Sequence, residues 1–211
     1  MNVGHFMTRN VITVTEDTRV TDAVDLMERN QFHRLPVIKD HRYIAMVTDK
    51  EISENSPSHL TSLSIFEMNY LFDKMAVGEI MTRQEVTVHA DTLLEEAATI
   101  MINENVTVLP VLNNQKHLVG IITYKDVFKA LIESTGYHQA GSRFLILIDE
   151  DRLGIVAHIT QTLSDAGISL THIFVHHLAD QIEITVQTAD ETGDRTVSAL
   201  RNEGYEAVRV Q

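Results

Sequence analysis

The sequence predicts a mixed α/β (α+β) protein made of two β-α-β-β-α repeats followed by a β-α-β-β-α-β domain. The first supporting observation is an internal repeat in the first two thirds of the chain. The second is that helix-type and strand-type hydrophobic periodicities alternate in the same order in each copy. The third is a different order of expected strands and helices after residue 142.

The repeat keeps its register over most of each copy. Residues 3–40 recur at an offset of 74, and after one inserted residue the offset is 75, so that Thr48 matches Thr123. Three pairs of segments carry much of the similarity: Val3-Gly4 with Val77-Gly78, Met7-Thr8-Arg9 with Met81-Thr82-Arg83, and Leu35-Pro36-Val37 with Leu109-Pro110-Val111. A register held over this length excludes chance similarity.

The first half of each repeat predicts a short strand and then a helix. The strands are expected at residues 11–14 and 85–88. Asp17-Thr18 and Asp91-Thr92 supply helix N-cap residues, and Thr92 with Glu95 fits a capping box. Each helix then has apolar residues at positions i, i+3, i+4 and i+7, which mark one buried face: Val20, Ala23, Val24 and Met27, and then Leu94, Ala97, Ala98 and Met101.

The second half of each repeat predicts two strands and the start of a closing helix. The strands are expected at residues 35–38 and 43–47, and again at 109–112 and 118–122. The closing helices begin at residues 48–51 and 123–126.

A connecting helix is expected between the repeats, at residues 59–74. Leu63, Phe66, Tyr70 and Leu71 give it an apolar stripe. Two interpretations stay open, in which this helix packs on the paired repeats or docks a partner.

The last third of the chain predicts a second kind of domain. Residues 137–142 are expected to be a linker, and residues 143–211 then have the β-α-β-β-α-β order of a ferredoxin-like fold. The strands are expected at residues 143–148, 168–176, 181–187 and 207–210, and the helices at 155–166 and 196–202.

The repeats resemble a tandem pair of CBS domains, which is often called a Bateman module. The matching features are Val-Gly-x-x-Met-Thr at each start, Leu-Pro-Val in each middle, and a closing strand followed by Thr-x-x-Asp/Glu. These features occur in the same order in both repeats, which makes the resemblance specific. It implies a first repeat at residues 1–58 and a second at 75–136.

Residues 143–211 resemble an ACT domain, a regulatory module that commonly binds amino acids. The resemblance rests on residues 151–154 and on the segment 163–168 that leads into the second strand. It implies an effector site at Asp151, Leu153, Gly154, Gly167 and Ile168. The combination of a CBS pair with an ACT domain resembles the bacterial acetoin-utilisation accessory protein family, which implies a role in acetoin or acetyl-CoA metabolism.

The strongest candidates for ligand binding are Thr48 with Glu51 and Thr123 with Asp126. A helix N-terminus offers free N–H donors to a phosphate, and a carboxylate one turn later can accept hydrogen bonds from ribose hydroxyls. This combination suits adenosine phosphates such as AMP or ATP. Thr-x-x-Asp/Glu is also a capping box, so the same residues could serve only to begin a helix.

The CBS resemblance adds further residues to the two nucleotide sites. It implies that Thr13 and Arg34 line the first site and that Thr87 and Val108 line the second. Lys50 and Lys125 lie inside the Thr-x-Lys-Asp/Glu motifs, where they could face phosphate or simply be solvated.

The second repeat is expected to hold the better nucleotide site. Gly120 would let a ligand approach the backbone closely, whereas the first repeat has Ala45 at this position. Glu51 has one methylene more than Asp126 and must fold back to hold a ribose.

Composition excludes several functional classes. The chain has a net charge of −13, with 30 acidic and 17 basic residues, so nucleic acid and anionic membranes are unsuitable partners. It also has no Cys, so it can form no disulfide. It contains no phosphate loop, nucleophile elbow or His-Glu-x-x-His motif, so neither a catalytic residue nor a catalytic cofactor is expected. His172, His176 and His177 are expected to be surface or interface residues, and a metal shared between subunits is the alternative.

These observations predict a cytoplasmic regulatory protein that senses adenine nucleotides, rather than an enzyme. The ACT-like domain would bind a second effector, such as an amino acid, or form a dimer contact. A homodimer or larger assembly is expected, because half-sized sheets with an apolar face need more cover than this chain provides. The regulated protein is not identified by the sequence. The alternatives are a ligand-free assembly protein and an enzyme of unfamiliar type.

Overall fold

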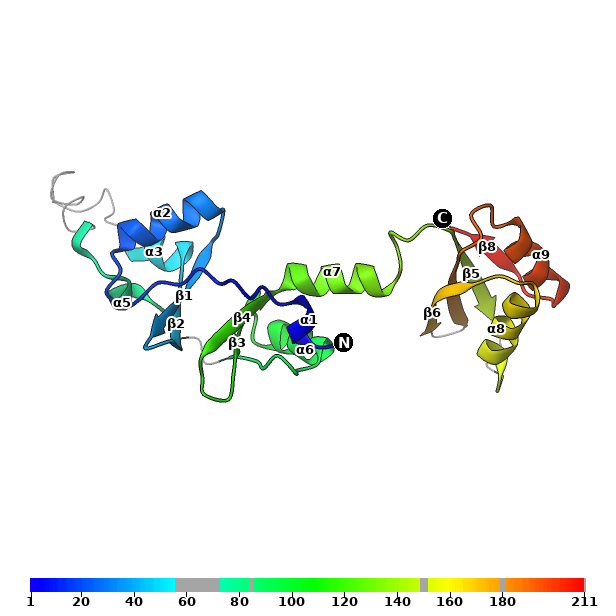
Figure 1. Ribbon diagram of the computed structural model, residues 1–211, viewed down its shortest axis with the longest axis horizontal. Coiled ribbons are helices and arrows are strands. Elements are labelled where there is room, and N and C mark those ends of the chain that lie inside the picture. The colour runs from blue at the N-terminus through cyan, green and yellow to red at the C-terminus, as the bar shows by residue number, and fades with distance from the viewer. Residues whose placement is uncertain (56–72, 84–85, 149–151, 179–180, 211) are drawn as a thin grey trace. The chain divides into compact units, whose positions relative to one another are not determined.

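A computed structural model describes residues 1–55, 73–83, 86–148, 152–178 and 181–210 (Figure 1). The chain forms two compact units, Met1–Val127 and Phe128–Gln211. The division falls within one helix, α7 (Tyr124–Ser134). Most of the expected connecting helix at residues 59–74 lies outside the described residues.

The first unit contains two similar halves, as the repeat predicts. The first half has α1 (Val3–Phe6), α2 (Val20–Asn30), the hairpin β1 (Arg34–Lys39) and β2 (Arg42–Thr48), and α3 (Asp49–Asn55). The second half has α5 (Val77–Ile80), α6 (Leu94–Asn103), the hairpin β3 (Val108–Leu112) and β4 (Leu118–Thr123), and the start of α7. Both hairpins are antiparallel.

The expected first strand of each repeat is much shorter than predicted. Only Val14 pairs with Val37, and only Val88 pairs with Val111, each as a single parallel bridge. Residue 85, where the second of these strands was expected to begin, lies outside the described residues. These short pairings still fix the segment before each helix against the middle of the following hairpin.

The expected N-caps of the first helices are wrong. The helices α2 and α6 have Arg19 and Leu93 as their N-cap residues, with no side-chain cap hydrogen bond. The Thr18 hydroxyl instead accepts a hydrogen bond from the Thr15 N–H, and the Thr92 hydroxyl accepts one from the His89 N–H, both at 3.0 Å. These threonines therefore close the turn that precedes each helix.

The leading segments of the two repeats are exchanged. The N–H groups of Val3 and Gly4 donate to the carbonyls of Thr92 and Ala90 in the second repeat, at 2.9 and 2.7 Å. Reciprocally, Val77 and Gly78 donate to the carbonyls of Thr18 and Glu16 in the first repeat, both at 2.8 Å. Each half of the unit is thus completed by the start of the other repeat.

This exchange is also visible in the hydrophobic core. The buried cluster of the first half takes residues from the start of the second repeat as well as from α2, β1 and β2. Its members from outside the first repeat include Val77 and Ile80. The first half therefore cannot bury its core without the start of the second repeat.

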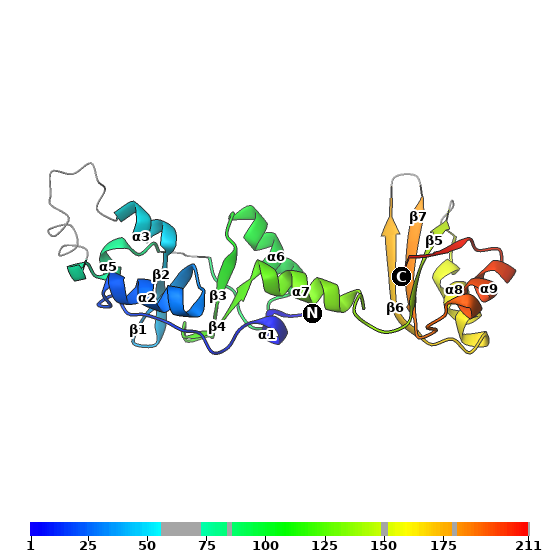
Figure 2. The same ribbon diagram turned by 90° about the horizontal axis from the view of Figure 1, so that it is seen from above.

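The second unit is a four-stranded sheet with two helices on one face (Figure 2). Its elements are β5 (Ser142–Ile148), α8 (Ile155–Asp165), β6 (Leu170–His177), β7 (Ile182–Thr188), α9 (Asp194–Asn202) and β8 (Ala207–Arg209). The spatial order of the strands is β6-β7-β5-β8, and all neighbouring strands are antiparallel. The predicted β-α-β-β-α-β order is confirmed.

The core of the second unit lies between this sheet and its helices. Phe144, Ile146 and Ile184 of the sheet pack with Ile159 of α8 and Leu200 of α9, and all five are fully buried. Among the described residues, no helix is both long and apolar enough to span a membrane.

Candidate functional site

Each hairpin of the first unit ends at a Thr–carboxylate pair. Thr48 ends β2 and lies opposite Arg34 of β1, and Glu51 follows in the first turn of α3. The same register places Thr123 opposite Val108, with Asp126 in the first turn of α7. The structure thus brings three of the four predicted site residues of each repeat to one end of its hairpin.

In the first repeat, both carboxylate oxygens of Glu51 are occupied. Oε2 accepts hydrogen bonds from the backbone N–H of Thr48, at 3.0 Å, and from the Thr48 hydroxyl. Oε1 accepts a hydrogen bond from the hydroxyl of Thr82, at 3.0 Å, and Thr82 belongs to the leading segment of the other repeat. Burial acts to raise the pKa of Glu51, but the hydrogen bonds from Thr48 and Thr82 outweigh it and hold the pKa below its ordinary value.

In the second repeat, Asp126 uses only one of its two oxygens. Oδ2 accepts hydrogen bonds from the backbone N–H and the hydroxyl of Thr123, at 2.8 and 2.7 Å. Within the described part of the chain, Oδ1 has no hydrogen-bond partner. The Thr-x-x-Asp/Glu motifs are therefore helix caps in both repeats, and only the second cap leaves a carboxylate oxygen available for a ligand.

The space next to Gly120 is not available to a ligand. A Cβ atom on Gly120 would lie 2.7 Å from the Met7 sulfur and 2.9 Å from the carbonyl oxygen of Thr8. Thr8 and Ile121 exchange two backbone hydrogen bonds, both of 2.9 Å. The expectation that Gly120 admits a nucleotide is therefore wrong, because the leading segment of the chain occupies that space.

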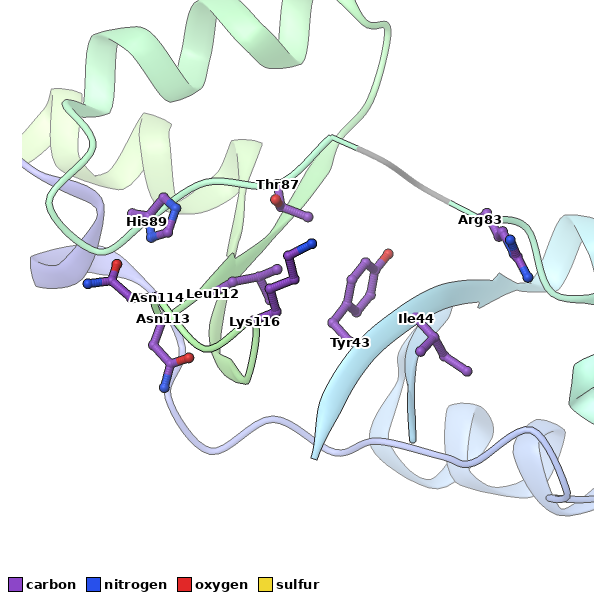
Figure 3. Close-up of a pocket in the computed structure, with 9 residues that line it drawn as sticks. All are labelled: Tyr43, Ile44, Arg83, Thr87, His89, Leu112, Asn113, Asn114 and Lys116. Atoms are coloured by element: carbon purple, nitrogen blue, oxygen red, sulfur yellow. The ribbon is translucent and has the colours of Figure 1, made fainter. Parts of the chain in front are cut away.

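The remaining predicted residues of the nucleotide sites lie elsewhere. Thr87 lines a cleft of about 550 Å³ at the turn end of the hairpins, with residues from β2 and from the turn between β3 and β4 (Figure 3). Thr13 lines a related cleft of about 440 Å³ with residues from the start of β4. Neither cleft includes Thr48, Glu51, Thr123 or Asp126.

The two lysines of the motifs differ in their surroundings. Lys50 Nζ lies 3.8 Å from Oε1 of Glu54, one turn along α3, and Lys50 is a solvated surface residue. Lys125 lies in the first turn of α7, and the structure shows no ion pair for it within the described residues.

The predicted effector residues of the second unit are only partly brought together. Leu153 and Gly154 line a cleft of about 830 Å³ with Arg152, His158 and Tyr205. Gly167 and Ile168 do not line this cleft, and Ile168 belongs to the hydrophobic core. Asp151 lies outside the described residues.

The cleft of the second unit is lined by three polar side chains that contact one another, Tyr205, His158 and Glu203. His158 Nδ1 lies 2.7 Å from the Tyr205 hydroxyl, and His158 Nε2 lies 3.4 Å from a Glu203 carboxylate oxygen. Burial raises the pKa of Tyr205. Within the described residues, no group of three His, Asp or Glu side chains could hold a metal ion.

Sequence reasoning missed the basic and aromatic residues of the turn-end clefts, among them Tyr43, Arg83 and Lys116. A signal was present, since Arg9 and Arg83 are equivalent in the repeat and each precedes Thr13 or Thr87 by four residues. It could not be interpreted without knowing that the hairpin turns of both repeats meet beside these arginines.

Comparisons with known proteins match the first unit. The family model described as CBS domain matches residues 3–57 and 77–133. The uncharacterised protein MJ1225 of Methanocaldococcus jannaschii is 30% identical over 132 residues, which are 60% of this chain and 46% of that protein. An inosine-5'-monophosphate dehydrogenase of Korarchaeum cryptofilum is 27% identical, over 89% of this chain and 36% of the enzyme. The chain thus spans less than half the length of these two relatives.

Solved protein structures also align with this chain. The crystal structure of MJ1225 aligns with a TM-score of 0.55 and 29% identity, over 62% of this chain and 47% of that one. The structure of CBSX2, a CBS-pair protein of Arabidopsis thaliana, in complex with AMP aligns with a TM-score of 0.53 and 31% identity. This second alignment covers 63% of this chain and 97% of CBSX2.

Proposed function

The chain belongs to the CBS domain family, as a tandem pair, and from this premise we propose that it is a regulatory protein that senses an adenosine-containing ligand through its second repeat. The main support is Oδ1 of Asp126, which has no hydrogen-bond partner within the described residues and belongs to the carboxylate that the Thr123 hydroxyl contacts at the start of an 11-residue helix. CBSX2, which is similar over nearly all of its length, is crystallised with AMP, and this supports the choice of ligand class.

The chemistry of this helix start suits a nucleoside monophosphate. Asp126 Oδ1 can accept a hydrogen bond from a ribose hydroxyl while Oδ2 keeps the helix capped. The positive end of the α7 dipole favours an anion. Thr123 and Asp126 are the central residues of the proposed site, and Val108, opposite Thr123, provides an apolar wall.

The first repeat has a weaker role in this proposal. Arg34, Thr48 and Glu51 form the equivalent site, but a ligand there must displace the hydroxyl of Thr82 from Glu51. Thr13 and Thr87 line the two turn-end clefts, and neither cleft includes Thr48, Glu51, Thr123 or Asp126. We therefore assign these two threonines to a separate site.

The mechanism is a shift between two arrangements of the repeats. A ligand changes this equilibrium only as far as its affinity differs between the two arrangements. The exchanged leading segments are suited to this coupling, because each repeat contributes backbone hydrogen bonds to the other. The output passes to a regulated protein in acetoin or acetyl-CoA metabolism, as the resemblance to the accessory family implies, in the cytoplasm.

We propose that the second unit is an ACT-like domain that serves as a second effector site or as a dimer contact. Its ferredoxin-like order and the cleft beside Leu153 and Gly154 support an amino-acid ligand, because Arg152 offers a partner for a carboxylate and Glu203 one for an ammonium group. Light scattering should show a dimer or a larger assembly at micromolar concentration, and deleting residues 143–211 should weaken it. A monomer at that concentration would disprove the assembly.

The alternative is that the protein is an enzyme, and one observation favours it, the similarity to an inosine-5'-monophosphate dehydrogenase. Since the alignment covers 36% of that enzyme, it leaves most of the enzyme unmatched. Incubation of the purified protein with nucleotides and acyl-CoA should show no turnover, and steady product formation would favour the enzyme.

The test of the nucleotide site is calorimetric titration of the full-length protein with AMP. Asp126→Ala should weaken binding by about tenfold or more, because a hydrogen bond to a charged group contributes about 1.5–3 kcal/mol. Glu51→Ala is the matched control in the first repeat and should matter less. Melting temperatures must be measured in parallel, because losing a helix cap costs about 1 kcal/mol.

Two outcomes would contradict the proposal. If Glu51→Ala abolishes AMP binding and Asp126→Ala leaves it intact, the roles of the two repeats are reversed. If neither substitution changes the affinity, the two motifs are helix caps only, and the protein is better described as an assembly protein.

A further inference from the structure

The turn cleft, lined by Tyr43, Arg83, Thr87, Leu112, Asn113, Lys116 and their neighbours, is a feature that the proposed nucleotide site does not use (Figure 3). It is formed by both repeats, since Tyr43 belongs to β2 and Lys116 to the turn between β3 and β4. Figure 3 shows Thr87 and Lys116 on one side of Tyr43 and Arg83 on the other side, and all four residues line the cleft. The volume of about 550 Å³ is in the range of small-molecule sites.

The charge of the turn cleft is opposite to that of the protein. The chain has a net charge of −13, yet the described residues that line the cleft include Arg83 and Lys116 and no carboxylate. Within the described part of the chain, neither cation takes part in an ion pair. Lys39, Lys50 and Lys129, by contrast, each have an acidic partner. A cleft with two such cations attracts an anion.

The backbone around Lys116 is fixed in advance. Asn113 Oδ1 accepts hydrogen bonds from the backbone N–H groups of Gln115 and His117, both at 2.9 Å, and Lys116 N–H donates to the Asn113 carbonyl. Lys116 adopts a left-handed conformation with φ of 63°. Its carbonyl accepts a hydrogen bond from Tyr43 N–H at 3.3 Å, which joins the two hairpins. The turn therefore presents Lys116 to the cleft at a defined place.

The hydroxyl of Tyr43 provides a second, independent reason to expect a ligand in the turn cleft. Its oxygen is buried and has no hydrogen-bond partner within the described part of the chain. Buried polar atoms nearly always have a partner, and an unpaired one has a free-energy cost. Burial also raises the pKa of Tyr43, so the hydroxyl keeps its proton and is a donor at neutral pH.

The related cleft at Thr13 shows what is special about the turn cleft. In the related cleft, Leu118 is the repeat equivalent of Tyr43 and has no hydroxyl, and His41 is the repeat equivalent of Lys116. The arginine of this cleft, Arg9, already donates to the Gly4 carbonyl at 2.8 Å. The related cleft thus lacks both the unpaired hydroxyl and the second permanent cation.

We propose that the turn cleft binds a small organic phosphate with a flat or apolar group, at a site separate from the Thr123–Asp126 junction. Lys116 and Arg83 pair with the phosphate oxygens, and the Thr87 and Tyr43 hydroxyls donate hydrogen bonds to them or to the ester oxygen. The apolar group lies against the Tyr43 ring and Leu112. The binding does not depend on the proposed nucleotide function.

The test is calorimetric titration of the full-length protein with phenyl phosphate, in parallel with inorganic phosphate. Phenyl phosphate should bind more tightly than inorganic phosphate, because only the ester has a group that packs on Tyr43. Removing both cations, in Arg83→Ala/Lys116→Ala, should weaken phenyl phosphate binding by about tenfold or more. Both residues are exposed, so the double variant is expected to fold normally.

Matched variants distinguish the turn cleft from the related cleft and from the Thr123–Asp126 junction. His41→Ala removes the equivalent of Lys116 in the related cleft, at a residue with φ of 64°, and should leave the affinity unchanged. Asp126→Ala should leave it unchanged too, although it weakens AMP binding. Tyr43→Phe should lower the affinity roughly threefold without lowering the melting temperature, because the hydroxyl has no partner to lose.

Three results would overturn the proposal. The first is no detectable binding of phenyl phosphate to the wild type at millimolar concentration. The second is wild-type affinity in Arg83→Ala/Lys116→Ala. The third is a loss of phenyl phosphate binding in Asp126→Ala, which would place the anion at the nucleotide site.

Discussion

The two repeats have the same backbone plan and use the same motif differently where the hairpin meets the closing helix. In the first repeat, Glu51 caps its helix with one oxygen and holds Thr82 of the other repeat with the second. In the second repeat, Asp126 caps its helix through Oδ2, and Oδ1 has no partner within the described residues. The same position is thus a link between repeats in one copy and an open acceptor in the other.

Side-chain length explains this difference. Glu51 has one methylene more than Asp126, so its carboxylate can reach both its own helix start and the neighbouring leading segment. Thr8 is the equivalent of Thr82, but its hydroxyl makes no hydrogen bond within the described part of the chain. A single methylene therefore decides which repeat keeps a carboxylate oxygen for a ligand.

The hairpins differ in a second way, at Gly120 and its equivalent Ala45. Gly120 lies against Met7 and Thr8 so closely that a Cβ atom would have to displace backbone. Ala45 is fully buried, and its neighbour Met46 pairs with Thr82 of the other leading segment. The first junction thus accommodates a methyl group that the second one excludes.

The largest effect is expected from Gly120→Ala. The new Cβ would lie 2.9 Å from the Thr8 carbonyl oxygen, which cannot move without loss of the Thr8–Ile121 pairing. Overpacking of this kind costs about 1–3 kcal/mol, and urea unfolding should show the loss. Ala45→Gly, the reverse change at the equivalent position, should cost only about 0.5–1 kcal/mol. A Gly120→Ala variant as stable as the wild type would mean that the leading segment does not lie here.

A smaller effect is expected from Thr82→Val. The substitution keeps the shape of the side chain and removes the hydrogen bond to Glu51 Oε1, so the unfolding free energy should fall by about 1 kcal/mol. Thr8→Val is the matched control and should be close to neutral. Thr82→Val should also raise AMP affinity in the first repeat, and a second binding event in calorimetry would show it. Equal effects of the two substitutions on stability would contradict the asymmetry.

Local patterns predicted most of the fold. The offset of the repeat gave the positions of the hairpins and helices, because periodicity and turn residues are local properties. The caps at residues 48–51 and 123–126 were also correct as one of two interpretations, since a Thr and a carboxylate three residues apart meet in the first turn of a helix. The order of elements in the second unit followed from the same kind of pattern.

Contacts between distant segments could not be predicted. Thr18 and Thr92 have good capping side chains, but each closes the preceding turn, whose carbonyls receive the leading segment of the other repeat. Gly120 was correctly singled out as a close approach, but the approaching group is Met7–Thr8 and not a ligand. Thr13 and Thr87 line clefts that only the pairing of the two repeats creates, because residues of both repeats contribute to each cleft.

The smallest expected effect is on the pH dependence of the unfolding free energy. Its measurement tests whether Glu51 stabilises the fold as a charged group. Its pKa is lower in the folded protein than the ordinary value of 4.5, since the hydrogen bonds from Thr48 and Thr82 favour the carboxylate over its protonated form. A carboxyl group with a lowered folded-state pKa stabilises the fold fully above its unfolded-state pKa and loses this contribution as pH falls through the folded-state value.

The wild type should therefore be more stable than Glu51→Gln at pH 7. Because the half-buried side chain still contacts solvent, we expect a difference of less than about 1 kcal/mol, and it should shrink as pH falls below about 4.5. Urea unfolding of both proteins from pH 7 to pH 3 measures this, and in a Thr82→Val background the difference should be smaller at every pH. A difference that stays constant down to pH 3 would show that Glu51 contributes through its shape and not through its charge.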